Sequence, residues 1–277
     1  MNPSVSRWTR RLGAAAAVAT LLLGTAACGG DGEGAGKPQA KGIGIVKEGK
    51  LTVCTHLPYK PFQYEEGGKV VGFDVDLLDL LAKDLGVEIE VVDIEWAQIT
   101  SGAVFAANKC DVGMGAMTIT DERANALNIT DPYMDATQVL LVKKDSPYKT
   151  LEDLKGKKVG VQTDTTGQEY AEKQAETIGF SVVPFDDLAL QTNAVKSGKV
   201  DAGINDNGVL YDFVSDNPDV AVVAEFDTGE QYGFAAKKDD ADGDKLVKKF
   251  NELLGKAKDD GTYAEIYQKW FGVEPPK

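Results

Sequence analysis

The chain has 277 residues, 43% of them hydrophobic, which is enough for one large domain or two lobes around a buried core. Its formal net charge of −14 at pH 7 would repel a phosphate backbone, so nucleic acid is not an expected partner. The single histidine, His56, and the spacing of the three cysteines match no zinc site, and we expect neither a metal nor another cofactor.

Residues 1–27 have the pattern of a signal peptide. Three arginines precede an apolar run at 12–23, which is shorter than the roughly 20 residues of a transmembrane helix. Small residues then lead to Cys28 in a pattern that resembles a bacterial lipobox, so we expect export and lipidation of Cys28. The alternative is a plain secretory signal cut near Ala27. Residues 28–42 are Gly-rich and predict a flexible tether to a membrane surface.

The next segment alternates between strands and helices. We expect strands at 51–54, 87–92 and 112–114, a hairpin that joins 62–64 to 70–73, and helices at 74–85 and 97–107. Asp74 is expected to cap the first of these helices, and Gly86 to end it.

The alternation restarts near Thr150. We expect a short helix there, strands at 158–161, 181–185, 202–205 and 233–237, and helices at 168–178, 188–197, 207–214, 246–258 and 263–270. Such a pattern predicts an α/β fold with mostly parallel sheets. The two alternating segments are each long enough to form a lobe, so we expect two lobes with a cleft between them. Ligands bind such sheets at the carboxyl ends of the strands.

Two cysteines remain beside Cys28. Cys54 lies late in one predicted strand and Cys110 just before another, so parallel neighbours would place them at different heights. Export would permit a disulfide, but this register argues against one.

Two segments carry side chains that suit a zwitterion. Burial of an amino acid removes water from both of its charges, so each charge needs a fixed partner. Residues 114–123 turn through small residues past Thr118 to Arg123, whose guanidinium suits a carboxylate, and residues 200–207 include Asp206, which suits an ammonium. The alternatives are a surface Arg123 paired with neighbouring acids and an Asp206 that caps the next helix.

The run GAMTITDERANALNITDPY is similar to the signature of the type 2 periplasmic amino-acid-binding proteins, solute-binding family 3, which serve polar amino acid ABC importers. The segments LTVCTHLPYKPFQYEEGGKVVGFDVDLLDLLAKDLG, LEDLKGKKVGVQTDTTGQEYA and VDAGINDN also resemble this family, and the likeness covers nearly all of 43–272 in order. It implies a two-lobed periplasmic-binding-protein-like fold (type II). The implied ranges are 43–135 with 233–277 for one lobe, 136–232 for the other, and hinge crossovers near 133–138 and 229–232.

The resemblance also implies how the ends of an amino acid are held. Arg123 would clamp the α-carboxylate, helped by the Thr118 hydroxyl and the backbone amides of Thr118 and Thr166. Asp206 would hold the α-ammonium, and the Ala116 carbonyl and Thr118 would share it.

The side chain of the ligand would meet a second group of residues. Tyr59 and Trp96 occupy the aromatic wall positions of the family, although Trp96 is alternatively a core residue. His56 stands where many relatives carry an Asp, which weakens the case for a basic ligand and favours a neutral polar one such as glutamine. Gln162 and Asn205 also face the predicted cleft. The alternatives are that His56 only finishes a strand and that the two amides are solvated.

The function implied is that of a lipid-anchored, monomeric substrate-binding protein on the extracytoplasmic face of the cell membrane. It would deliver an amino acid to ABC permease subunits and would not be an enzyme. One alternative is a dehydratase resembling cyclohexadienyl dehydratase, which needs a general acid in the cleft, and no residue here matches one. The other is a sensory ligand-binding protein, but no signalling domain follows Lys277.

Overall fold

The computed structural model describes residues 37–276, so the predicted signal peptide, Cys28 and most of the predicted tether lie outside the described residues. The first described elements are β1 (Gln39–Ala40) and β2 (Ile43–Gly44), which pair antiparallel and bury Ala40. The fold therefore begins inside the range predicted as tether. Between residues 37 and 276, no helix is long and apolar enough to span a membrane.

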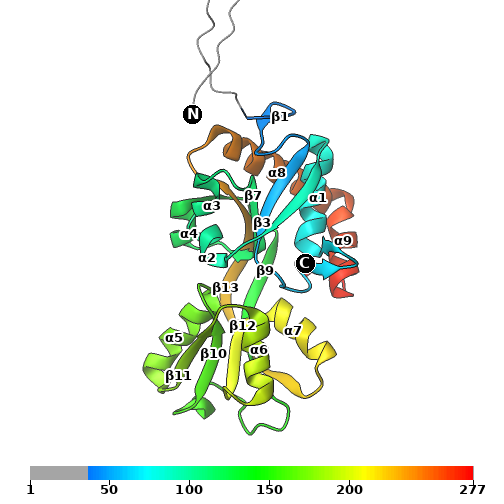
Figure 1. Cartoon of the computed structure of the whole chain (residues 1–277). Coiled ribbons are helices and arrows are strands. Elements are labelled where there is room, and N and C mark those ends of the chain that lie inside the picture. Colours follow the sequence, from blue (N-terminus) through cyan, green and yellow to red (C-terminus); the bar gives the residue numbers. More distant parts are fainter. Residues whose placement is uncertain (1–36, 277) are drawn as a thin grey trace, which may run out of the picture. The chain divides into compact units, whose positions relative to one another are not determined.

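Lobe 1 is built on a sheet with the strand order β6-β3-β7-β13, in which β6, β3 and β7 are parallel and β13 is antiparallel to β7 (Figure 1). Its strands are β3 (Lys50–Thr55), β6 (Glu88–Asp93), β7 (Val112–Thr118), β8 (Leu127–Ile129) and the end of β13 (Val220–Lys237), with a β4–β5 hairpin (Tyr64–Glu66, Lys69–Val71). Its helices are α1 (Phe73–Leu85), α2 (Trp96–Thr100), α3 (Ala103–Ala106), α4 (Asp121–Ala126), α8 (Ala241–Asp260) and α9 (Thr262–Phe271).

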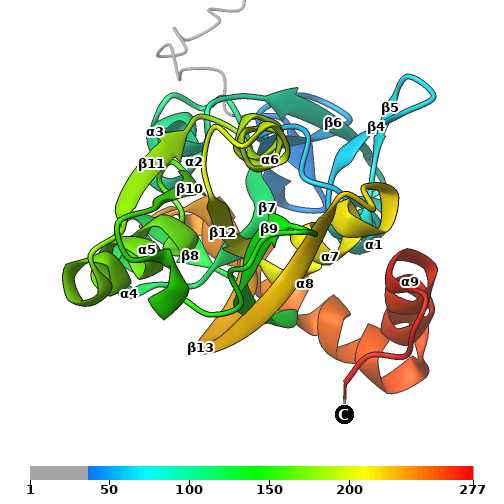
Figure 2. The ribbon, with the colours of Figure 1, turned by 90° about the horizontal axis from the view of Figure 1, so that it is seen from below.

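Lobe 2 has the strand order β11-β10-β12-β9-β13. Its elements are β9 (Met134–Lys143), β10 (Lys158–Gln162), β11 (Ser181–Phe185), β12 (Ala202–Asp206), the start of β13, the 3₁₀ turn η1 (Glu152–Leu154), α5 (Thr166–Ile178), α6 (Leu188–Ser197) and α7 (Asn207–Asp216). Figure 2 shows α5 and α6 on opposite faces of this sheet. Lobe 2 is thus the α/β sandwich that the alternation predicts.

Two long antiparallel strands, β9 and β13, join the lobes. Their pairing runs from Met134 opposite Tyr232 to Lys143 opposite Val220, and it is interrupted where residues 227–229 of β13 face Thr137 alone. Gly229 adopts a φ of +68° there, a left-handed conformation that glycine tolerates at low cost. A bulge of this kind redirects the side chains that follow it.

Most predicted elements are present. The helix at 188–197 is confirmed at both ends, because the Asp187 side chain accepts from the Leu190 amide and Gly198 ends the helix in a left-handed conformation. The predicted helix 97–107 is wrong as one element, since it divides into α2 and α3 at Gly102, whose φ is +77°. The periodicity did not predict β8, β9, α4 or the first two thirds of β13.

The predicted cap of α1 is also wrong. The N-cap is Gly72, and Asp74 lies inside the first turn with its side chain completely buried. Asp74 Oδ1 accepts from the Tyr133 hydroxyl at 2.8 Å and Oδ2 accepts from the Ala116 amide at 2.8 Å. Its carboxylate therefore ties α1 to β7 and to the segment just before β9, rather than capping a helix. Gly86 ends the helix as predicted.

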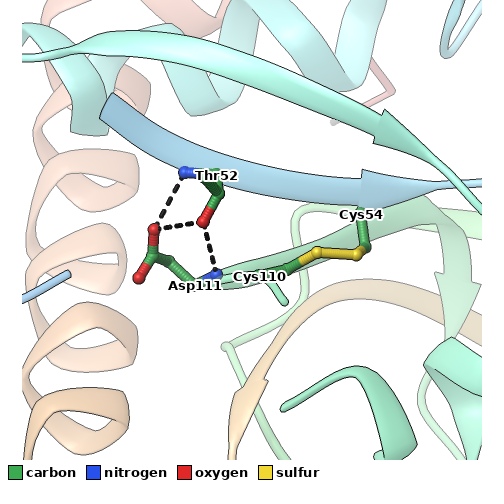
Figure 3. The surroundings of a disulfide bond; sticks show 4 residues. All are labelled: Thr52, Cys54, Cys110 and Asp111. Carbon is green, nitrogen blue, oxygen red and sulfur yellow. Dashed lines mark hydrogen bonds between the residues drawn. A yellow bond between two sulfur atoms is a disulfide. The ribbon is translucent and has the colours of Figure 1, made fainter. Parts of the chain in front are cut away.

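The expectation of unbridged cysteines is corrected by a disulfide between Cys54 and Cys110, whose Cα atoms are 5.7 Å apart (Figure 3). The Asp111 carboxylate accepts from the Thr52 amide at 2.8 Å and from the Thr52 hydroxyl at 2.6 Å, so the start of β7 is held beside β3. Thr52 and Cys54 share one face of β3, because strand side chains alternate. Cys110, adjacent to Asp111, then reaches Cys54 from outside the regular part of β7. The register argument failed because it extended β7 straight back to Cys110.

Candidate functional site

A pocket between the lobes contains nine of the ten residues that the sequence nominates for the cleft, all except Asn205. Its lining comprises His56, Tyr59, Gln63, Trp96, Gly115, Ala116, Thr118, Arg123, Gln162, Thr165, Thr166 and Asp206. The empty space is about 360 Å³, part of it open to solvent. Gln63, Gly115 and Thr165 were not predicted.

Arg123 is the cationic group of the pocket. It lies on α4 in lobe 1, and its guanidinium donates to the Thr118 carbonyl at 2.9 Å and to the Asp164 carbonyl of lobe 2 at 3.1 Å. The residue is only 8% exposed, and none of the acids among residues 37–276 lies within salt-bridge distance of it. Because a guanidinium has five N–H donors, most of its hydrogen-bonding capacity remains for an anion. The surface-pairing alternative is wrong.

Asp206 is the opposite charge and comes from the end of β12 in lobe 2. Its Oδ2 accepts from the hydroxyls of Tyr232 at 2.6 Å and Tyr59 at 3.1 Å, and its Oδ1 accepts from the Gln138 amide at 2.7 Å. Burial, and then the nearby charge of Glu230, raise its pKa to about 6. The side chain makes no capping bond to α7, although it holds the N-cap position. No lysine or arginine of the described chain pairs with it.

The N-terminus of α5 faces the same space through Thr165 and Thr166. The first N–H groups of a helix have no acceptor within the helix, and the macrodipole adds partial positive charge there. Thr166 is thus placed so that its amide and Arg123 can act on one anion.

Several hydrogen bonds cross from lobe 1 to lobe 2 at this site. Trp96 Nε1 donates to the Asp164 carbonyl at 3.0 Å, and the Tyr59 hydroxyl donates to Asn205 Oδ1 at 2.8 Å. The lobes therefore meet through residues that also line the pocket.

Trp96 forms one wall of the pocket and lies over Arg123, with the guanidinium carbon 5.5 Å from the ring centroid. A Cβ at Gly115, which has a φ of +155°, would come within 2.6 Å of the indole. Only glycine permits this close approach of the ring to the backbone of β7. Trp96 is largely buried, but it is a pocket wall and not only a core residue.

The remaining end of the pocket holds polar atoms without partners. His56 Nδ1 lies 3.2 Å from the Ile94 carbonyl, which can only accept, so Nδ1 carries a proton and Nε2 of the neutral ring is an acceptor. Among the described residues, His56 Nε2 and the Oε1 atoms of Gln63 and Gln162 are buried without a hydrogen-bond partner. Unpartnered buried polar atoms are costly, which favours a ligand that satisfies them.

Asn205 does not line the pocket. Its Oδ1 accepts from Tyr59 and from the Asp206 amide, and its Nδ2 donates to Gln191 at 2.7 Å, so its polar atoms are used within the protein. Gln63 lines the pocket instead and is its second amide side chain, beside that of Gln162. Sequence reasoning placed Gln63 within a hairpin strand, where alternation alone does not reveal that its side chain reaches the cleft.

The chain is similar to a family of solute-binding proteins. Residues 51–273 match the model of the bacterial extracellular solute-binding proteins, family 3. A probable histidine-binding protein of Neisseria gonorrhoeae is 33% identical, over 94% of this chain and 95% of its own. The glutamine-binding protein GlnH of Bacillus subtilis is 35% identical, over 93% and 94%. The structure of an ancestral arginine-binding protein bound to arginine is similar with a TM-score of 0.75 and 41% identity, over 81% of this chain and 99% of that one.

Asp74 predicts a pH dependence of stability. Burial raises its pKa from 3.8 to about 7, so the folded protein holds a proton on Asp74 that the unfolded chain has released between these values. The free energy of unfolding due to this group therefore falls as the pH rises from about 4 to about 7. We expect Asp74→Asn to remove this trend, which amounts to up to about 4 kcal/mol at 1.36 kcal/mol per pH unit.

Urea unfolding of the two proteins between pH 4 and 8 measures this difference. Asp79→Asn, which neutralises a partly exposed acid on the same helix, is the control and should run parallel to the wild type. Parallel curves for Asp74→Asn would show that Asp74 titrates normally.

Proposed function

Because the chain belongs to the bacterial extracellular solute-binding proteins, family 3, we propose that it captures a polar amino acid between its lobes for an ABC importer. One observation carries the proposal: a buried guanidinium and a buried carboxylate, neither with an oppositely charged partner in the described chain, line a single pocket. A buried charge is stable only when paired, and a zwitterion supplies both missing partners at once.

Each end of the ligand has its own set of partners. Arg123 takes the α-carboxylate together with the backbone amides of Thr118 and Thr166. Asp206 takes the α-ammonium together with the Ala116 carbonyl and the Thr118 hydroxyl. With a pKa of about 6, Asp206 is mostly ionised at pH 7, as a partner for an ammonium must be.

The lobes would close around the ligand through β9 and β13. Ligand bound to Arg123 of lobe 1 and to Asp206 of lobe 2 favours the arrangement in which both contacts exist. The permease subunits of the importer would recognise this closed form. Tyr59 and Trp96 would form the walls around the aliphatic part of the ligand.

We further propose that the protein binds without catalysis. Asp206 is the only pocket residue with a raised carboxyl pKa, and it is occupied by the ammonium in this account. The relatives described above carry the names of binding proteins.

The first test removes the cationic partner. Arg123→Ala should weaken amino acid binding more than about 100-fold, because loss of one partner of a buried ion pair costs about 3–5 kcal/mol. Isothermal titration calorimetry measures the affinity. Arg123→Lys, which keeps the charge without the planar fork, should bind with an intermediate affinity. Near-normal affinity in a folded Arg123→Ala protein would refute the site.

The side chain of the ligand should carry hydrogen-bond donors. His56 Nε2 and the Oε1 atoms of Gln63 and Gln162 lack partners, and all three are hydrogen-bond acceptors in the structure. Glutamine, arginine and histidine have donor side chains, and the names of the relatives include all three. Glutamine remains our first expectation, since no acid stands at position 56.

A thermal-shift screen with the twenty amino acids tests this selectivity. A ligand at 100 times its Kd adds about 2.7 kcal/mol to the free energy of unfolding, so its midpoint rises. We expect shifts with amino acids whose side chains donate hydrogen bonds, and none with glutamate or aspartate. A shift with glutamate alone would show that the pocket offers donors, and not acceptors, to the side chain of the ligand. Prephenate and arogenate belong in the same screen, and turnover of either would establish an enzyme.

We propose that the protein is anchored as a monomer to the extracytoplasmic face of the cell membrane. The proposal is supported by the sequence of the leader, which predicts cleavage after Ala27 and lipidation of Cys28, and by the residues that link Cys28 to the fold.

Cys28→Ala should abolish metabolic labelling with palmitate and release the protein into the soluble fraction. Labelling that persists in Cys28→Ala would contradict the anchor, and an unlabelled wild type would indicate plain secretion.

A further inference from the structure

Glu230 is not among the residues that line the pocket, yet it holds two threonines that are, Thr118 and Thr166. It follows the bulge of β13, and its Oε2 accepts from the Thr118 hydroxyl and from the Thr166 hydroxyl, each at 2.7 Å. Thr118 ends β7 in lobe 1, whereas Thr166 begins α5 in lobe 2. One carboxylate oxygen on a hinge strand thus contacts hydroxyls from both lobes.

These contacts determine the direction of the hydroxyl protons. A threonine hydroxyl has one proton to donate and two lone pairs with which to accept. The two hydroxyl oxygens are 3.4 Å apart, farther than either is from Glu230, and a carboxylate is the stronger acceptor. Each proton therefore points to Glu230, and both threonine oxygens are left as acceptors toward the pocket.

The threonine hydroxyls are thereby unsuited to a carboxylate. We propose that Glu230 is a positioning residue that fixes the Thr118 and Thr166 hydroxyls as acceptors for the α-ammonium and leaves the α-carboxylate to Arg123 and backbone amides. The inference rests on the proposed function. It assigns the Thr118 hydroxyl to one end of the ligand, where the family resemblance gave it to both.

Gln138 joins Glu230 to Asp206. Its Nε2 donates to Asp206 Oδ1 at 2.7 Å and to Glu230 Oε1 at 3.1 Å, and its opposite Oε1 is buried without a partner. Rotation of the amide would place an oxygen between two carboxylates, so its orientation is determined. Thr228, on the bulge itself, donates to Glu230 Oε1 at 2.7 Å and fixes the carboxylate from the other side.

The charged and titratable groups around the ammonium position come from four elements. Asp206 of β12 and Glu230 of β13 are the acids, and Arg123 of α4 is the cation. Tyr59, in the loop after β3, and Tyr232 of β13 donate to Asp206, and burial raises the pKa of both hydroxyls. Two acids thus lie on the Asp206 side of the site and one cation on the Arg123 side, which favours an ammonium beside Asp206 and a carboxylate beside Arg123.

Glu230→Gln tests this role, since it keeps the shape, removes the charge and replaces one of the two acceptor oxygens with an amide donor. The probes are L-glutamine and L-arginine, titrated calorimetrically between pH 5 and 8. We expect about a 10- to 100-fold loss of affinity at pH 7.5, because hydrogen bonds to charged groups contribute about 1.5–3 kcal/mol. Glu225→Gln is the matched control: Glu225 lies on the same strand and accepts from Thr137 and from Tyr211 at 2.8 Å, outside the pocket.

The pH profile separates positioning from a structural effect. In the wild type, affinity should fall as the pH drops through about 6, where Asp206 takes up a proton. Loss of the Glu230 charge lowers the pKa of Asp206, so in Glu230→Gln this fall should move to lower pH, while Glu225→Gln keeps the wild-type profile. Unchanged affinity and profile in Glu230→Gln would overturn the inference alone. Failure of the wild type to bind any amino acid would overturn the proposed function with it.

Discussion

The arrangement of the pocket depends on one constraint: two opposite charges are buried on different lobes, and neither is neutralised by the described chain. Arg123 and Asp206 line the same space, but their hydrogen bonds go to neutral groups. An isolated buried charge is far more costly than a paired one. In the proposed function, a zwitterion would offset this cost only with both lobes around it, so the interaction that provides affinity would also favour closure.

Buried contacts within lobe 1 hold the backbone that faces the ligand position, and two strands connect the lobes. Asp74, buried in the first turn of α1, holds the Ala116 amide and the Tyr133 hydroxyl, so it fixes the backbone that faces the ligand. Asp111 and the disulfide hold β7 beside β3 in the same lobe. The register of β9 and β13 shifts between Val222 and Ala224 and again at the bulge at 227–229. Glu230 follows this bulge directly and therefore reaches the cleft from the hinge.

The sequence predicted helix ends where the signal is local, and it predicted site residues where the resemblance to a family identified their positions. Helix α6 begins and ends as predicted because both of its ends are determined locally. The Asp187 side chain accepts from an amide of the first turn, and Gly198 ends the helix in a left-handed conformation. Nine of the ten residues nominated for the cleft line one pocket, since the family motifs mark the ends of strands that converge in space. Arg123 and Asp206 are recognised in this way, although each alone has an ordinary structural alternative.

The failures come from features that only tertiary structure determines. Asp74 looks like a helix cap by sequence position, but its partners lie 42 and 59 residues away. Strands β9 and β13 run from one lobe toward the other, so the residues that pack against them change along their length. Their sequences therefore have no single hydrophobic period. Glu230 gains its role from a bulge, and Gln63 from the packing of a hairpin, neither of which a sequence pattern specifies. The disulfide was missed because a straight strand was assumed before Val112.

The most direct measurement is a crystal structure of the protein with the amino acid that stabilises it most. The account predicts an α-carboxylate about 3 Å from the Arg123 guanidinium and an α-ammonium about 3 Å from the Asp206 carboxylate, which are ordinary charge-assisted hydrogen-bond distances. A ligand bound elsewhere, or one whose carboxylate lies beside Asp206, would contradict the account.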